Sequence, residues 1–197
     1  MAIPRLVGYK RSQENAMIPL LSVDEAISRG KEVGLDDRFS SLNAFRVMLH
    51  NHRAAGAVAE LLRTLMFRNT LNPRIRELVI LRNGWRTGSE YEFCQHVRVS
   101  RDLKISEEEI LGVRDPGNCG AYDETDRAVI RMADELLDTS EVSAETWRIL
   151  QKAFPNEQLV ELLLVAGFWR MIAGYLKTAK VPLDAGVSSW PEGKPPA

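Results

Sequence analysis

The residue types best suited to acid–base chemistry lie together in segment 87–96, which reads TGSEYEFCQH. If this segment is helical, Glu92 and His96 lie four residues apart on one face, and Ser89 lies one turn closer to the N-terminus. A carboxylate and an imidazole at this spacing can share a proton, which makes them a candidate general acid/base pair. Two structural interpretations stay open: Ser89 and Glu92 also fit a capping box, and His96 could be a hydrogen-bonded core or interface histidine.

The rest of the sequence offers little further catalytic machinery. It contains no phosphate loop, no dinucleotide-binding glycine fingerprint, no His-Glu-x-x-His motif and no Gly-x-Ser-x-Gly motif. We interpret His50 and His52 as surface or helix-end residues, and with so few histidines we predict no metal site. Cys94 and Cys119 have neither the spacing of a disulfide framework nor that of a zinc finger, and on a helix Cys94 would point away from the candidate pair.

The composition is typical of a soluble globular domain. The chain has 197 residues and a formal net charge of −1, with 45% hydrophobic and 27% charged residues. Acidic and basic residues are interspersed, so we expect no nucleic-acid partner. The N-terminal residues lack the apolar core of a signal peptide, and no apolar run approaches about 20 residues. We therefore expect a cytoplasmic protein with free thiols and no membrane partner.

Start signals and apolar spacing predict helices along most of the chain. Capping boxes open helices after Ser22 and Ser106, and Asn72-Pro73 combines an N-cap with proline at the first helical position. Between residues 41 and 67 apolar residues recur at intervals of three and four, so one interrupted helix or two helices fit, with Gly56 as the weak point. Further helices are expected at 89–102, 124–137, 144–153 and 157–178.

These elements predict an all-α fold, a helical bundle of roughly seven to nine helices. Segment 157–178 is the longest and most apolar, so we expect it to be the central packing helix. No repeat or long linker divides the chain, and residues 1–183 should form a single all-helical domain. Residues 184–197, rich in Gly, Pro and Ser, should form a flexible tail.

A series of short motifs also runs through the middle of the chain: RELVILR at 76–82, WRTGSEYE at 85–92, His96, SEEEI at 106–110, DRAV at 126–129, ADEL at 133–136 and QLVEL at 158–162. With these motifs, which extend over most of residues 40–183, the chain resembles the carboxymuconolactone decarboxylase family, whose relatives include the alkylhydroperoxidase D type. The resemblance implies the helical bundle of that type and a homo-oligomer, a trimer or hexamer, with a dimer also open.

The resemblance separates two branches of the family. In the peroxidase branch a Cys-x-x-Cys pair precedes the histidine and an upstream glutamate completes a proton relay. The two cysteine positions fall on Ser89 and Glu92 in this chain, whereas the upstream glutamate falls on Glu77 and matches. The chain therefore keeps the glutamate and histidine of the relay and lacks both thiols, so we do not expect peroxide reduction by that route.

The decarboxylase branch uses no metal or organic cofactor. The resemblance therefore implies a cofactor-free lyase of decarboxylase type, or an isomerase, acting on a small cyclic or unsaturated carboxylic acid or lactone. In this interpretation His96 is the general acid or base, Glu92 and Glu77 orient it, and Ser89 binds a substrate oxygen.

Two other function classes stay open. One is an alkylhydroperoxidase-like thiol peroxidase that uses Cys94 or Cys119, and the other is a non-catalytic helical oligomer that binds a small ligand or a protein partner. Arg82 and Arg86 could hold a substrate carboxylate, but arginines on helices are more often solvated, so we leave both outside the catalytic assignment.

Overall fold

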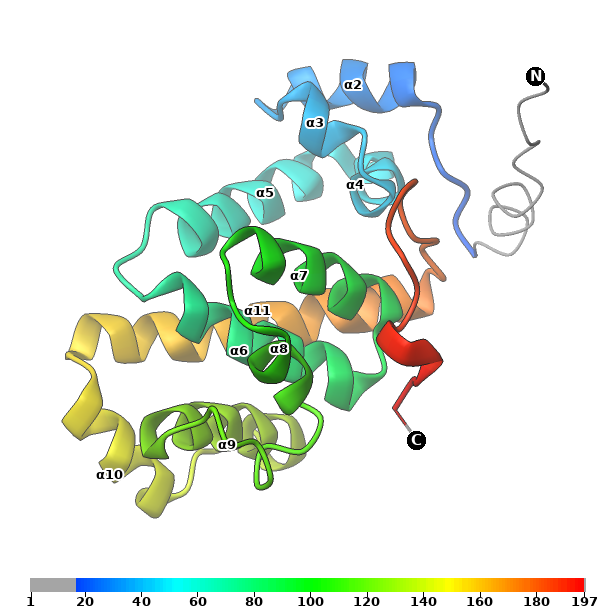
Figure 1. Ribbon diagram of the computed structural model, residues 1–197. Helices are drawn as coiled ribbons and strands as arrows, with labels where there is room; N and C mark the ends of the chain where they lie inside the picture. The colour runs from blue at the N-terminus through cyan, green and yellow to red at the C-terminus, as the bar shows by residue number, and fades with distance from the viewer. Residues whose placement is uncertain (1–16, 197) are drawn as a thin grey trace.

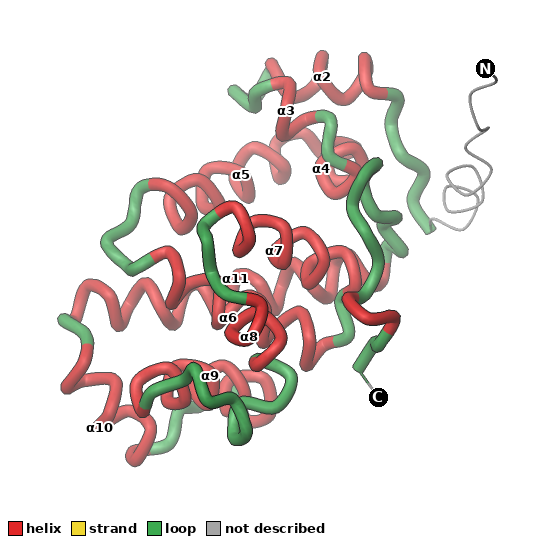
Figure 2. The backbone as a smooth tube through the Cα atoms, in the orientation of Figure 1, coloured by secondary structure: helices red, strands yellow, loops and turns green. Residues whose placement is uncertain are grey.

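The computed structural model describes residues 17–196, and over this range the chain consists of helices and loops without a β-strand (Figures 1 and 2). The predicted all-α class is therefore confirmed. The N-terminal residues in which we found no signal-peptide core lie outside the described range.

The helices succeed one another with short connections. Their bounds are α2 (Val23–Lys31), α3 (Asp37–Ser40), α4 (Asn43–Met48), the 3-10 helix η1 (Leu49–Asn51), α5 (His52–Phe67), α6 (Pro73–Thr87), α7 (Glu90–Asp102), α8 (Glu107–Gly112), α9 (Glu124–Thr139), α10 (Ala144–Ala153), α11 (Asn156–Thr178) and the 3-10 helix η2 (Pro191–Gly193). In Figure 1, α2 to α5 form the upper tier, α6, α7 and α11 the middle, and α9 and α10 the lower.

The helix starts follow the predicted signals. Ser22 and Ser106 each form a complete capping box, and Asn72 accepts a hydrogen bond from the backbone of α6 with Pro73 at the first helical position. The predicted interruption between 41 and 67 falls at η1 and not at Gly56, because the side chain of Asn51 caps the start of α5.

Helix α6 is the most enclosed element of the protein. Every residue from Ile75 to Gly84 is buried, since the helix packs against α7, α9 and α11. A Cβ atom added at Gly84 would lie 3.0 Å from the backbone nitrogen of Phe93, so glycine is what allows α6 and α7 to approach so closely. As a result, the polar side chains of α6 lie in the interior, where they need partners.

Helix α11 was expected to be the central packing helix, but it is buried on one side only. Leu162, Val165 and Ala173 are among the residues of its inner face, whereas other apolar residues of the helix are exposed. By length and composition alone α11 could cross a membrane, with a mean hydropathy of 1.6 over its most apolar window, of which 44% is buried inside the protein. This departs from our expectation that no apolar run approaches that length.

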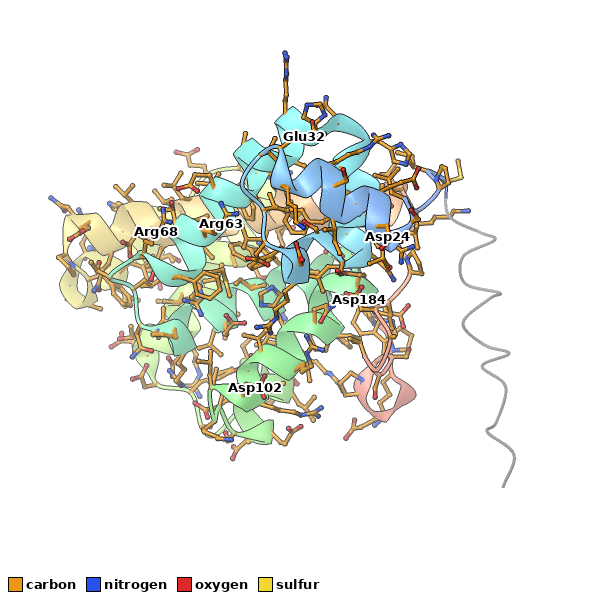
Figure 3. The ribbon with its side chains drawn as sticks, turned by 90° about the horizontal axis from the view of Figure 1, so that it is seen from above. Asp24, Glu32, Arg63, Arg68, Asp102 and Asp184 are labelled. Atoms are coloured by element: carbon orange, nitrogen blue, oxygen red, sulfur yellow. The ribbon has the colours of Figure 1, made fainter. Side chains whose placement is uncertain are left out.

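The segment after residue 183 lies against the helical body. Trp190 packs against Phe93 and Trp85, with ring centroids 5.2 and 5.9 Å away. Asp184 lies between the N-terminal helices and α7 (Figure 3), where it accepts hydrogen bonds from Tyr91 and the backbone of Asn43. The composition that predicted a flexible tail did not indicate these contacts, because they depend on single side chains.

Candidate functional site

The centre of the site is a hydrogen bond between α7 and α6. The Nδ1 atom of His96 lies 2.7 Å from Oε2 of Glu77. The Glu77 side chain has no exposed surface, and that of His96 is 13% exposed. The guanidinium of Arg76 lies 3.1 Å from the other carboxylate oxygen of Glu77 and supplies the opposite charge that a buried carboxylate requires. The two residues that the family resemblance assigned to a relay are therefore in direct contact.

A third helix fixes the proton position on the imidazole. The indole Nε1 of Trp169, on α11, lies 3.0 Å from Nε2 of His96. Because an indole N–H can only donate, Nε2 of His96 must accept, and the neutral ring then carries its proton on Nδ1. His96 thus donates from Nδ1 to Glu77 and accepts at Nε2 from Trp169. In this arrangement the lone pair on Nε2 is occupied by a single hydrogen bond.

Glu92 has a different environment from the one we expected. Its carboxyl is buried, at 2% exposure, and neither of its oxygens has a hydrogen-bond partner within the described residues. It therefore does not orient His96 through a hydrogen bond, although both lie on one face of α7. Burial without a compensating charge raises the pKa of Glu92 well above its ordinary value. This environment therefore favours the uncharged carboxylic acid, which is the form able to donate a proton.

Ser89 lies at the start of α7, but its side chain makes no capping hydrogen bond there. The capping-box interpretation of Ser89 and Glu92 is therefore wrong, because both side chains turn into the interior. The hydroxyl of Ser89 is fully buried and, like the side-chain carbonyl of Asn83 on α6, has no partner in the part of the chain that the structure describes. Unpaired buried polar atoms are rare in native proteins, so the hydroxyl of Ser89 and the side-chain carbonyl of Asn83 are available to form hydrogen bonds with a bound molecule.

The other candidate side chains lie elsewhere. Arg82 makes a two-pronged ion pair with Asp134 of α9, at 2.7 and 2.8 Å, and Arg86 pairs with the same carboxylate. These arginines join α6 to α9 and are not free to hold a substrate carboxylate. His50 contacts the backbone carbonyl of Pro19 at 2.9 Å, which fits the helix-end interpretation.

Both cysteines are buried, free thiols. Burial raises the pKa of the Cys94 thiol to about 12, so at neutral pH it is not a thiolate. Cys119 packs beneath α8, with its sulfur 3.7 Å from the backbone carbonyl of Glu108. Neither environment resembles the exposed, electropositive surroundings of a reactive cysteine.

Two further features define what surrounds the site. Among residues 17–196, no group of three or more His, Cys, Asp or Glu side chains is arranged to hold a metal ion. A cavity of about 500 Å³ lies on the opposite face of α7, between α8 and residues 186–192, and is lined by residues including Cys94, Arg98 and Trp190. His96, Glu92, Glu77 and Ser89 do not line it, so this cavity is separate from the acid–base residues.

Sequence reasoning missed the roles of Trp169 and Arg76. Trp169 lies in the segment predicted to be the central packing helix, and no local pattern connects it with a histidine 73 residues away. Arg76 precedes Glu77 directly, and adjacent residues on a helix ordinarily face different directions. The one available signal for Arg76 was the number of polar residues in the otherwise apolar segment that forms α6. Polar side chains that are buried need hydrogen-bond or ion-pair partners, and neighbouring buried polar residues can supply them.

The fold and the site define an all-helical protein with a buried glutamate–histidine pair. Residues 52–135 match the carboxymuconolactone decarboxylase family model. This match covers less than half of the chain and, with the shared fold of the solved structures below, supports the resemblance that the sequence motifs indicated. No curated protein matches the chain by sequence.

Solved structures share the fold at low sequence identity. An uncharacterized peroxidase-related protein with an alkylhydroperoxidase AhpD core, from Ralstonia eutropha JMP134, matches with a TM-score of 0.72 and 16% identity over 86% of this chain and 93% of that one. An uncharacterized peroxidase-related protein from Silicibacter sp. TM1040 matches with a TM-score of 0.68 and 14% identity, over 94% of this chain and 90% of that one. The debrominase Bmp8, as a cysteine-to-alanine variant in complex with 2,3,4-tribromopyrrole, matches with a TM-score of 0.71 and 14% identity, over 88% of this chain and 94% of that one.

Proposed function

We propose that this chain is a cytoplasmic, cofactor-free enzyme of the lyase or isomerase class that moves protons on a small cyclic or unsaturated carboxylic acid or lactone. The matched family is named for a decarboxylase, and a structural neighbour is a debrominase. The observation that carries the proposal is the placement of two proton carriers on one face of α7. Glu92 is a buried acid whose surroundings favour the protonated form, and Nε2 of His96 accepts a hydrogen bond from Trp169.

A buried acid that favours its protonated form and an imidazole with an accepting nitrogen are suited to opposite roles in acid–base catalysis. Nε2 of His96 accepts a proton once it exchanges its hydrogen bond with Trp169, a step that costs about 1 kcal/mol for one net hydrogen bond. The positive charge that forms on the ring is then stabilised by the carboxylate of Glu77, which is 2.7 Å from Nδ1. Glu77 is therefore a positioning residue in the proposal.

In the decarboxylation the bond between the ring carbon and the substrate carboxylate breaks. Carbon dioxide leaves, and the electron pair moves into the conjugated carbonyl. Glu92 then delivers its proton to the carbon skeleton, and His96 passes a solvent proton back to restore it, so atoms and charge balance over the cycle. Ser89, a buried hydroxyl without a partner, would bind the oxygen on which negative charge develops. The isomerase alternative uses the same two proton transfers without loss of carbon dioxide.

The proposal is tested by assaying the purified protein against a panel of unsaturated and lactone carboxylic acids, with products followed by mass spectrometry. We expect turnover of at least one acid, with a loss of about 10²-fold or more in His96→Gln and in Glu92→Gln. The matched control is the double variant Cys94→Ala with Cys119→Ala, which should retain the activity.

The outcomes separate the three function classes. Activity that is lost in the double cysteine variant and kept in His96→Gln would assign the chemistry to the thiols. Binding of an acid without any turnover, unchanged by Glu92→Gln, would assign the protein to the non-catalytic class.

A further inference from the structure

The cavity between α7, α8 and residues 186–192 has the dimensions of a ligand site. Its volume of about 500 Å³ falls within the range of about 300–1,000 Å³ that is typical of small-molecule sites. The residues assigned to the proposed reaction do not line it. A molecule bound there would therefore occupy a site of its own.

The inner wall of this cavity is apolar. Cys94 and Val97, on α7, are 4% and 3% exposed and belong to the main hydrophobic core. Leu111 of α8, together with Val187 and Trp190 of the C-terminal segment, is partly buried and packs against the same core. The wall thus offers an apolar and aromatic surface to the body of a ligand.

Contacts with the helical body hold the C-terminal side of the cavity in place. The ring of Trp190 lies 5.2 Å from that of Phe93, measured between centroids. Arg114 donates hydrogen bonds to the backbone carbonyl of Pro191 and to the carboxylate of Glu192, both at 3.2 Å. The cavity is therefore formed before a ligand arrives, as small-molecule sites usually are.

The charged residues of the lining leave one cation without a partner. Arg101 donates two hydrogen bonds to the carboxylate of Glu107, at 2.5 and 2.9 Å, so these two charges neutralise each other. Glu192 already has two basic partners, at 3.2 and 3.3 Å. Arg98 is exposed at the cavity and makes no ion pair or hydrogen bond with any side chain of residues 17–196. Its guanidinium is free to bind an anion.

We propose that this cavity binds a small carboxylic acid, with its carboxylate on Arg98 and its apolar ring or chain against the inner wall. A guanidinium presents parallel N–H donors that match the two oxygens of a carboxylate. A single unpaired cation matches a single negative charge, which favours a carboxylate over a phosphate dianion. A cationic ligand is less suitable, because both acids of the lining are paired and Glu90, outside the lining, accepts a hydrogen bond from Ser189.

The site is separate from the acid–base residues and does not rest on the reaction proposed above. Isothermal titration calorimetry of the full chain with 1-naphthoate and with its uncharged amide, 1-naphthamide, tests it. Both compounds have the same fused ring and differ in the charge that Arg98 would meet. We expect the wild type to bind naphthoate about threefold to tenfold more tightly than naphthamide.

Arg98→Gln should lose this preference and keep the wild-type affinity for naphthamide, because the substitution removes the charge and leaves the apolar wall intact. The matched control is Arg53→Gln, which makes the same change at an exposed arginine of α5 and should behave as wild type. Circular dichroism should show equal helix content in all three proteins.

The position of the ring is tested by NMR. Nuclear Overhauser effects should connect protons of bound naphthoate with the methyl groups of Leu111 and Val187. Trp190→Ala should weaken the binding of both compounds, since it removes part of the wall.

Three outcomes would overturn the proposal: a wild type that does not bind naphthoate, equal affinities for the two compounds, or a preference that survives in Arg98→Gln. Naphthoate binding that is lost in His96→Gln, without contacts to Leu111 and Val187, would also overturn it, because the acid would then occupy the acid–base site.

Discussion

Replacing Glu92 by glutamine should alter how the stability of the protein depends on pH. Burial raises the pKa of Glu92 in the folded state, whereas in the unfolded chain a glutamate titrates near about 4.3. Above that pH the unfolded chain releases a proton that the folded protein retains, so the unfolded state binds fewer protons. The stability that Glu92 contributes is therefore fully present below about pH 4.3 and is lost as the pH rises toward the folded pKa.

The size of the effect follows from proton linkage. Each pH unit in this window lowers the free energy of unfolding by about 1.4 kcal/mol for one proton. Glutamine has nearly the shape of the uncharged acid but cannot titrate, so Glu92→Gln should lack this slope. Urea titrations at a series of pH values from 5 to 8 should show the free energy of unfolding of Glu92→Gln rising relative to that of wild type as the pH increases toward the folded pKa of Glu92.

The exposed Glu141→Gln variant is the matched control and should differ from wild type by a constant amount. Parallel curves for wild type and Glu92→Gln would refute the reasoning. They would mean that the Glu92 carboxyl ionises as readily in the folded protein as in the unfolded chain, and that it is not the proton donor.

Three further perturbations have expected outcomes. Trp169→Phe removes the indole N–H that donates to His96, so the free energy of unfolding should fall by about 1 kcal/mol for the lost hydrogen bond, in addition to any loss of packing. ¹⁵N NMR of this variant should show that His96 is no longer confined to its Nδ1-protonated form. Glu77→Gln leaves the buried Arg76 without a counter-charge and should cost about 3–5 kcal/mol in urea unfolding. Glu60→Gln, which breaks two surface ion pairs, with Arg63 and Arg68, should cost about 1 kcal/mol or less. Titration with a thiol reagent should find both thiols slow to react until the protein unfolds, and unchanged in number after peroxide treatment; rapid reaction of the native protein would contradict their buried placement.

Local signals in the sequence predicted local structure well. The capping boxes at Ser22 and Ser106 and the Asn72-Pro73 start depend on side chains within a few residues of each other, and the structure contains all three. We predicted the interruption at Gly56, but the helix continues through this residue because a single glycine weakens a helix only slightly. The cap at Asn51 determines where the new helix begins.

The candidate site was predictable only in part. Resemblance to a family placed Glu77 beside His96, and the two are in contact. Helical spacing placed Glu92 on the face of His96 but could not show whether the two side chains touch, since this depends on the helices packed around them. The donor from Trp169 is a contact between distant parts of the chain, and nothing in the local sequence could reveal it.

The most direct test of the proton-transfer mechanism is the incorporation of deuterium from D₂O into the product of a lactone or unsaturated acid, measured by mass spectrometry on the wild-type protein and on Glu92→Gln. We predict that the wild-type product gains one deuteron at the carbon that receives the proton, and that Glu92→Gln forms this product at least about 10²-fold more slowly. Equal rates in the two proteins, or a rate that falls only when Cys94 and Cys119 are replaced, would contradict it.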